Sequence, residues 1–228
     1  MKVLVLLSGG IDSAVCLALA VKKYGKENVS TITFNYGQKN VQELKSCKKI
    51  AKYYEVENNI VDISNIFTST SCSLLKSSKK EIPKISYNEQ YKEDKKTSMN
   101  VPFRNGIMLS ICAGYALDKK ASVIYYGIHK EEGVAELLYP DCGEDFNLSM
   151  NLAIFIGSGK EVQIEAPLAV MYKKDIIKLG KKLKVPFELT WTCYESGNKS
   201  CGKCCACVDR LKGFKENKME DPIEYEAI

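Results

Sequence analysis

Apolar residues near the N-terminus form a short unbroken run that ends in two glycines. The run covers residues 3–7, the sequence Ser8-Gly9-Gly10 follows it, and an apolar stretch compatible with a helix covers residues 14–21. A continuous apolar run that stops at a glycine turn is typical of a buried strand, and the longer stretch after it predicts a helix. The chain therefore opens with a strand, a tight turn and a helix.

The next segments repeat this alternation. Residues 29–36 are rich in β-branched side chains and predict a second strand, residues 39–54 carry a helical apolar face, and residues 59–63 predict a third strand. A β-α-β-α-β pattern implies parallel strands joined by right-handed crossovers.

The pattern breaks between residues 64 and 100. Serine, threonine and lysine dominate there, Pro83 interrupts the segment, and few apolar residues could anchor it. A long insert of this kind in a compact domain is either a lid or mobile loop, or an excursion without a role, and the sequence leaves both interpretations open.

Regular structure resumes after residue 100. Helices are predicted at 106–117, 145–156 and 172–183, and strands at 122–127 and 161–166. The prediction is an α/β fold with about five parallel strands and helices on both faces, in which ligands bind at the carboxyl ends of the strands. We expect an α/β domain over residues 1–186, a cysteine-rich segment over 187–214 packed on it, and a tail over 215–228.

Composition narrows the class of protein. The 228 residues suit one large domain, and 45% of them are hydrophobic, which suffices for a full core. No run of 18 apolar residues predicts a membrane span, and too few residues precede the glycines for a secretory signal, so we expect a cytoplasmic protein. The net charge of +5 fits solvated lysine-rich faces, and without a basic stripe with interleaved aromatic residues we do not expect direct nucleic-acid binding.

The glycine turn has the composition of an anion cradle. Two adjacent glycines allow positive φ angles, so that backbone N–H groups can point into one concavity at the positive end of the following helix. Ser8 and Ser13 add hydroxyl groups, and Asp12 suits a metal or a helix cap. The string S-G-G-x-D-S resembles the pyrophosphate loop of the N-type ATP pyrophosphatases; the alternative is that the glycines serve only the turn.

Four of the ten cysteines have metal-ligand spacing. Cys193, Cys201, Cys204 and Cys207 follow C-x7-C-x2-C-x2-C, with glycines between them. Thiolates on tight turns suit a closed, structural, tetrahedral Zn²⁺ site, and an iron–sulfur cluster is the competing interpretation. Cys205 is left out because adjacent ligands would be strained. Four further cysteines are expected to be core or incidental residues: Cys16, Cys47, Cys72 and Cys112. The single histidine, His129, is either a general base or incidental.

Several strings together resemble one family. They are S-G-G-I-D-S at 8–13, V-P-F-R-N at 101–105, Y-P-D-C at 139–142, T-C-Y-E-S-G at 192–197 and C-G-K-C-C-A-C at 201–207, in order along nearly the whole chain. They resemble the 7-cyano-7-deazaguanine (preQ0) synthases of the QueC family, within the PP-loop ATP pyrophosphatases. The resemblance implies a Rossmann-like fold of the HUP (adenine nucleotide alpha hydrolase) type.

The resemblance also implies an activity, which is conversion of 7-carboxy-7-deazaguanine to preQ0 with ATP, Mg²⁺ and ammonia, and a structural Zn²⁺ on the four cysteines. A homodimer is expected, with the apolar helix at 106–117 as a candidate contact. By the same resemblance Asp12, Arg104 and Lys173 are expected to be catalytic, and Arg104 and Asn105 to contact the substrate. Asp141 is expected to contact it because a carboxylate can accept two N–H groups of the guanine-like edge, although Asp141 could equally be a turn residue after Pro140. The expected ATP-binding residues are Leu7, Ser8, Gly9, Gly10, Ile11, Asp12, Ser13, Ala14 and Gln38.

The chain departs from the family pattern in three places. Phe103 stands where the family usually has glycine, Leu137-Leu138 replaces Ser-Gly, and Gly143 replaces arginine. A lost arginine and a more apolar loop change how a charged substrate is held. Two further hypotheses therefore stay open. One is a paralogue that conjugates the adenylated acid to an amine of a partner protein, and the other is a non-enzymatic zinc and nucleotide scaffold.

Overall fold

A five-stranded parallel sheet forms the centre of the molecule. The computed structural model describes residues 1–86, 89, 91–92, 98–130, 139–195 and 197–226. Within them the strand order is β3-β2-β1-β4-β5, and every neighbouring pair is parallel. The strands are β1 (Lys2–Leu6), β2 (Val29–Asn35), β3 (Glu57–Asp62), β4 (Ala121–Tyr125) and β5 (Gln163–Glu165). The predicted α/β fold is confirmed, with strand limits within a few residues of those expected.

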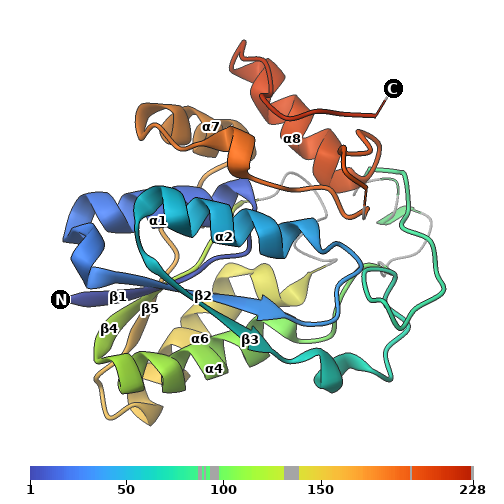
Figure 1. Cartoon of the computed structure of the whole chain (residues 1–228). Helices are drawn as coiled ribbons and strands as arrows, with labels where there is room; N and C mark the ends of the chain where they lie inside the picture. Colours follow the sequence, from blue (N-terminus) through green and yellow to red (C-terminus); the bar gives the residue numbers. More distant parts are fainter. Residues whose placement is uncertain (87–88, 90, 93–97, 131–138, 196, 227–228) are drawn as a thin grey trace.

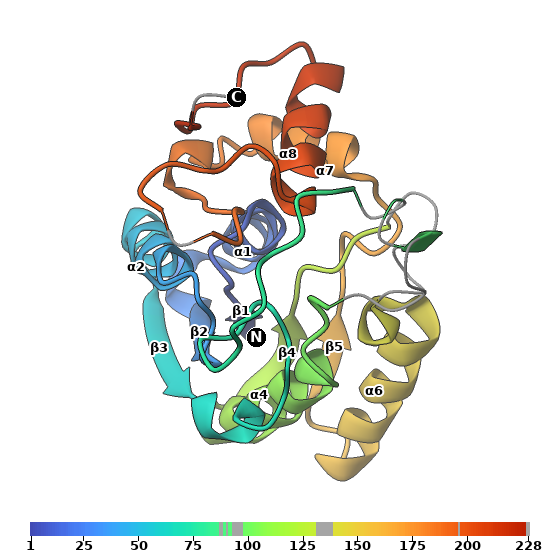
Figure 2. The same ribbon diagram turned by 90° about the vertical axis from the view of Figure 1, so that its right-hand side faces the viewer.

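Helices cover both faces of this sheet (Figures 1 and 2). One face carries α1 (Ile11–Tyr24) and α2 (Gln42–Tyr54), and the other carries α4 (Arg104–Lys119) and α6 (Glu144–Gly157). Two further helices, α7 (Lys173–Lys182) and α8 (Cys205–Glu216), form an additional layer outside α1 and α2. Short 3-10 turns are η1 (Lys26–Asn28), η2 (Ser64–Phe67), η3 (Pro140–Cys142) and η4 (Phe187–Leu189).

The apolar run of β1 is continuous because both of its faces are buried. Val3 and Val5 pack into the core on the α1 side, whereas Leu4 packs into the core on the α4 side. Alternate side chains of a strand point to opposite faces, so a central strand covered on both sides needs an apolar residue at every position. β1 pairs with both β2 and β4, and the strand order reverses beside it. This places the glycine turn after β1 at the edge where such sheets bind ligands.

The described part of the insert after β3 is anchored. Cys72, Leu75, Ile82 and Met99 are buried in the core on the α4 side. The backbone N–H of Lys39 donates to the carbonyl of Leu74 at 2.8 Å, and a neighbouring bond joins residues 76 and 37. The segment therefore has more anchors than its composition indicated, because isolated apolar residues without periodicity carry no sequence signal. Its role as a lid stays a prediction.

The last residues pack against the cysteine-rich segment through one buried ion pair. Arg210 on α8 contacts both carboxylate oxygens of Asp221, at 2.7 and 2.8 Å, and both side chains are almost fully buried. Tyr225 donates its hydroxyl to the same carboxylate, and the backbone of Ser200 bonds to residues 224 and 226. Among the described helices, none combines the length and the apolar character that a membrane crossing requires.

Candidate active site and metal centre

The turn after β1 has the tight geometry that its two glycines predict. Gly9 has a φ of +85°, and a Cβ atom at this position would lie 2.6 Å from the carbonyl oxygen of Glu43 on α2. Only glycine fits this close approach without strain. Ser8 donates its backbone N–H to the hydroxyl of Ser13 at 3.1 Å, and that hydroxyl donates to the carbonyl of Gly10 at 3.1 Å. The start of α1 thus opens onto the turn, as an anion site requires.

A cavity of about 270 Å³ lies beside this turn. Its wall contains most of the residues expected to bind ATP, together with Arg104, Asn105 and Lys173, so the fold brings together side chains from positions far apart in the sequence. The ATP-loop residues in the wall are Leu7, Ser8, Gly10, Asp12, Ser13 and Gln38. Ile11 and Ala14 are buried outside the described wall, and with Gly9 they shape the turn and the first turn of α1.

Asp12 is the centre of a charged cluster on the side of the cavity formed by the glycine turn. Lys173 lies 2.9 and 2.8 Å from its two carboxylate oxygens, and His129 Nδ1 lies 3.1 Å from Oδ2. Burial alone would raise the pKa of Asp12, but Lys173 and His129 outweigh it and hold that pKa well below its ordinary value. Asp209 on α8 lies 3.7 Å from Lys173. His129 is therefore part of the cluster rather than incidental.

The other side of the cavity combines a cation, an aromatic ring and a carboxyl group. Arg104 donates to the hydroxyl of Tyr36 at 3.4 Å and lies over the same ring, 5.2 Å from its centre. Burial raises the pKa of Glu43 to about 7, although Arg104 and a hydrogen bond with Gln38 both act to lower it. Gln38 itself is held by the backbone N–H of Tyr36, which donates to its Oε1 at 2.9 Å.

Asp141 forms hydrogen bonds within the protein, at the start of α4. Its carboxylate accepts the backbone N–H of Asn105 at 2.9 Å, and the side chain of Asn105 donates to its carbonyl oxygen at the same distance. A carboxylate at this place satisfies an unpaired N–H group at the start of α4. Asn105 and Cys142 reach the cavity wall, whereas Asp141 is buried beside them and outside the described wall. Its expected contact with the substrate stays a prediction.

Phe103, one of the departures from the family pattern, has a backbone conformation that suits glycine better than phenylalanine. Its φ is +52° and its ψ is +28°, which is the left-handed region where glycine is favoured. The residue is 58% exposed, and its ring packs edge-on against Phe146, with ring centres 5.8 Å apart. Gly143 precedes the first turn of α6. Leu137 and Leu138 lie outside the described residues.

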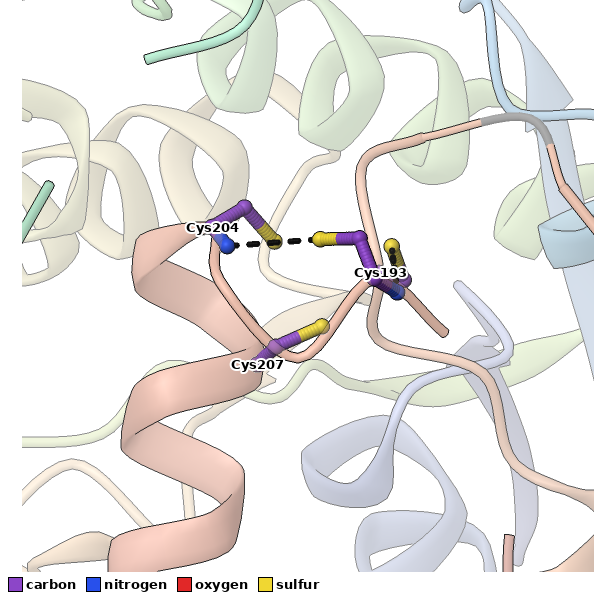
Figure 3. A group of neighbouring side chains, drawn as sticks. Cys193, Cys204 and Cys207 are labelled. Atoms are coloured by element: carbon purple, nitrogen blue, oxygen red, sulfur yellow. Dashed lines mark hydrogen bonds between the residues drawn. The ribbon is translucent and has the colours of Figure 1, made fainter. Parts of the chain in front are cut away.

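The four predicted metal ligands meet in one buried group. Their sulfur atoms all lie within 4.8 Å of one another, and Figure 3 shows the sulfurs of Cys193, Cys204 and Cys207 turned toward a common centre. Zinc–sulfur bonds of about 2.3 Å in a tetrahedron separate the sulfurs by about 3.8 Å, so the group fits Zn²⁺ after a small contraction. The backbone N–H groups of Glu195 and Cys201 both donate to the sulfur of Cys193 at 3.3 Å, as suits a thiolate.

Short contacts tie the metal segment to the glycine turn. The backbone N–H of Trp191 donates to the carbonyl of Gly9 at 2.8 Å, and its indole N–H donates to the carbonyl of Cys193 at 2.8 Å. The side chain of Asn40 also donates to the carbonyl of Cys193. A metal bound here would therefore stabilise the loop that forms one wall of the cavity.

Part of the cavity wall comes from residues outside the motifs recognised in the sequence. Tyr36, Glu43, Trp191, Tyr194 and Asp209 all line it. Glu43 carried one usable signal, because it lies in the first turn of the helix that follows the second strand. Asp209 and Tyr194 had none, because their segments reach the cavity only when α7 and α8 pack over α1.

Comparison with known proteins agrees with these motifs. The family described as "Queuosine biosynthesis protein QueC" matches residues 2–218. A relative from Caldicellulosiruptor saccharolyticus, named 7-cyano-7-deazaguanine synthase, is 39% identical over 99% of this chain and 96% of its own length. A relative of the same name from Archaeoglobus fulgidus is 39% identical over 98% of this chain and 90% of its own length.

A solved structure shares the fold. NMN synthetase from Francisella tularensis superposes with a TM-score of 0.51, at 14% sequence identity, over 96% of this chain and 78% of that chain. At this identity the likeness concerns the arrangement of strands and helices alone.

Proposed function

The chain belongs to the QueC family of queuosine biosynthesis proteins, and we propose that it converts 7-carboxy-7-deazaguanine to 7-cyano-7-deazaguanine (preQ0) with ATP and ammonia. ATP adenylates the carboxylate and releases pyrophosphate. Ammonia then replaces AMP to give the amide, and a second adenylation of the amide oxygen, followed by loss of AMP, gives the nitrile. Two relatives from different organisms are named 7-cyano-7-deazaguanine synthase, and the match covers at least 90% of each of them, which supports the assignment.

The observation that carries the proposal is one cavity with two chemically different sides. The glycine turn and the start of α1 provide an anion site, while Arg104, Tyr36 and Asn105 face it from the other side. Adenylation requires that a carboxylate and the α-phosphate of ATP meet, so the two groups must share one enclosed space. Hydroxide is a poor leaving group, and AMP takes its place.

Charged side chains of the chain suit the transfer of a nucleotidyl group. Lys173 can move from Asp12 toward the phosphates, and Arg104 can hold the anionic acid or the α-phosphate as negative charge develops. Asp12 would hold Mg²⁺, which offsets charge on the departing pyrophosphate when it is bound. Its lowered pKa keeps this carboxylate ionised at every physiological pH.

We also propose that the four cysteines hold a structural Zn²⁺. Four protein ligands leave no open position, so the ion acts on stability and on the position of the 191–194 loop rather than on the reaction. Trp191 donates hydrogen bonds to the carbonyl groups of Gly9 and Cys193, and through these bonds the metal would fix the position of the glycine turn in the cavity wall.

The proposed homodimer would use α6. The expected contact at 106–117 falls on α4, whose apolar residues are largely buried, whereas α6 exposes Leu148, Leu152 and Ile156 by more than half each. These three residues are four positions apart and form one stripe. Light scattering of the wild type and of a Leu152→Glu variant tests this arrangement, with a dimer expected for the first and a monomer for the second.

A single assay tests the proposed activity. The protein is incubated with ATP, Mg²⁺, ammonium and 7-carboxy-7-deazaguanine, and AMP and preQ0 are quantified by mass spectrometry. We expect two AMP per nitrile. AMP without nitrile or amide would favour conjugation to an amine of a partner protein, and no AMP with any deazaguanine would leave the scaffold hypothesis.

A further inference from the structure

Within the described part of the chain, the carboxyl group of Glu43 lines the cavity without a salt bridge to a cation. Asp12 contacts Lys173 and His129, and Asp209 lies 3.7 Å from Lys173. Among the described residues, Glu43 lines the same cavity, forms no salt bridge, and has a hydrogen bond with the uncharged side chain of Gln38. A carboxylate that is desolvated and not neutralised by a partner is costly for the fold, and such groups concentrate at functional sites.

Glu43 is also placed beside the anion site by the backbone. It lies in the first turn of α2, and its carbonyl oxygen is the atom that a Cβ on Gly9 would meet at 2.6 Å. Its side chain shares the cavity wall with Arg104 on α4 and Tyr36 after β2. The carboxylate therefore shares one cavity with the turn that would hold the phosphates and with the cation that would hold the acid.

The proposed reaction requires a group in this cavity that accepts a proton. Ammonia is present mainly as ammonium near neutral pH, and ammonium has no free electron pair. It must lose one proton before its nitrogen can attack the acyl adenylate. The new C–N bond then forms, the C–O bond to AMP breaks with its electron pair on the phosphate oxygen, and a second N–H proton leaves to solvent. The sum is acyl adenylate plus ammonium giving amide, AMP and two protons.

We propose that Glu43 is the group that accepts the proton of ammonium in the amide-forming step. The inference rests on the proposed function, and it assigns a role to a residue outside the glycine turn, the arginine site and the metal centre. His129 and Asp209 are less suited, because each lies against the Asp12–Lys173 pair.

The electrostatics of the cavity are consistent with this role. A general base works best with a pKa near the working pH, and burial raises that of Glu43 to about 7. The ionisable groups that act on it are Arg104, Tyr36 and Cys47. Burial raises the pKa of Tyr36 and raises that of Cys47 to about 12, while nearby groups such as Tyr36 raise that of Arg104 despite its burial. All three keep one charge state between pH 5 and 9, so Glu43 titrates alone among them.

The test separates adenylation from ammonia attack. ATP–pyrophosphate exchange with 7-carboxy-7-deazaguanine and no ammonium measures the first step, and amide formation from ammonium measures the second. We expect a Glu43→Gln variant to keep exchange within about threefold of wild type and to lose about 100-fold or more in amide formation. Hydroxylamine, which is mainly neutral at pH 7, should restore product formation in the variant, as the hydroxamate. The exposed Glu188→Gln is the matched control and should behave as wild type.

Three results would overturn the inference. Equal loss of exchange and amide formation would make Glu43 a residue of the binding site. Amide formation at the wild-type rate would exclude proton acceptance by it. A loss that hydroxylamine does not restore, with weaker binding of the acid, would assign Glu43 to recognition of the deazaguanine ring. If wild-type protein shows no exchange, the proposed function itself fails, which is a distinguishable outcome.

Discussion

Lys173 Nζ lies 2.8 Å from Asp12 Oδ2 and so joins the start of α7 to the first turn of α1 across 161 positions of sequence. The two side chains are 13% and 19% exposed, so solvent screens the pair only weakly. This contact holds in place both charged groups that the proposed reaction needs.

The Asp12→Asn variant should lose AMP release while keeping its metal. The amide keeps the size of the side chain and removes the negative charge that would hold Mg²⁺, so we expect a loss of about 100-fold or more. Chromatography of AMP measures the rate, and elemental analysis should still find one zinc per chain. The exposed Asp118→Asn serves as control, and full turnover of Asp12→Asn would refute the placing of Mg²⁺.

Alanine should be tolerated at one glycine of the turn and not at the other. Gly9 has a φ of +85°, and its Cβ would lie 2.6 Å from a backbone oxygen, whereas the Cβ of Gly10 would lie 3.7 Å from its nearest neighbours. We expect Gly9→Ala to lower the free energy of unfolding by about 1–3 kcal/mol and Gly10→Ala to change it by less than about 0.5 kcal/mol. Urea unfolding measures both. Equal losses would mean that the turn is not as tight as described.

Glu43 should make the stability of the protein fall as pH rises. Its pKa is about 7 in the folded protein and about 4.3 in an unfolded chain, so the folded state binds more protons between these values. The free energy of unfolding therefore decreases with pH across this range. We expect Glu43→Gln to be more stable than wild type by about 1–3 kcal/mol at pH 8 and equal to it near pH 4. Thermal or urea unfolding across pH measures the difference, and a variant that is less stable at pH 8 would contradict the assigned burial.

Two neighbouring cysteines should respond differently to serine. Cys204 belongs to the four-sulfur group, whereas Cys205 is buried next to it on α8 and lies outside the group. We expect Cys204→Ser to lose metal and to melt at a lower temperature, and Cys205→Ser to keep one zinc per chain. Elemental analysis of zinc in each variant separates the two outcomes. Iron and visible absorption in the wild-type protein would instead indicate that the four cysteines hold an iron–sulfur cluster.

Removing one partner of the Arg210–Asp221 pair should lower the free energy of unfolding strongly, whereas replacing both partners with apolar residues should lower it only slightly. Both side chains are at most 3% exposed, so Arg210→Met leaves a buried carboxylate without its cation and should cost about 3–5 kcal/mol. The double variant Arg210→Met/Asp221→Leu removes both charges and should recover much of this loss. Lys212→Met, which breaks an exposed contact of 3.9 Å with Glu216, should cost less than about 0.5 kcal/mol. Additive losses in the double variant would show that the two residues act independently.

Local signals in the sequence were sufficient to predict the strands and helices, the glycine turn and the cysteine cluster. The unbroken apolar run of residues 3–7, the glycines after it and the alternating segments predicted a parallel α/β sheet, and the spacing of four cysteines predicted one cluster. These signals are short-range, because a strand, a tight turn and a metal loop each impose their requirements on residues that are close in sequence.

The sequence could not assign the carboxylates to their roles. Asp141 was expected either to contact the substrate or to serve as a turn residue; in the structure it accepts the N–H of Asn105, and its contact with the substrate stays a prediction. Glu43 was read as part of a helix, and it lines the cavity without a salt-bridge partner among the described residues. Both are acidic residues beside a helix start, so composition and periodicity cannot tell them apart.

The sequence by itself determined which segments become strands and helices, that the first turn is a glycine cradle, and which four sulfurs gather. Tertiary structure alone decided that Lys173 and His129 contact Asp12, that Asp209 and Tyr194 reach the cavity, and that Glu43 lines it without a salt bridge to any described residue. The reason is that the charge state of a carboxyl group depends on its desolvation and on charges within a few ångströms. Those neighbours come from elements that meet only when α7 and α8 pack over the sheet.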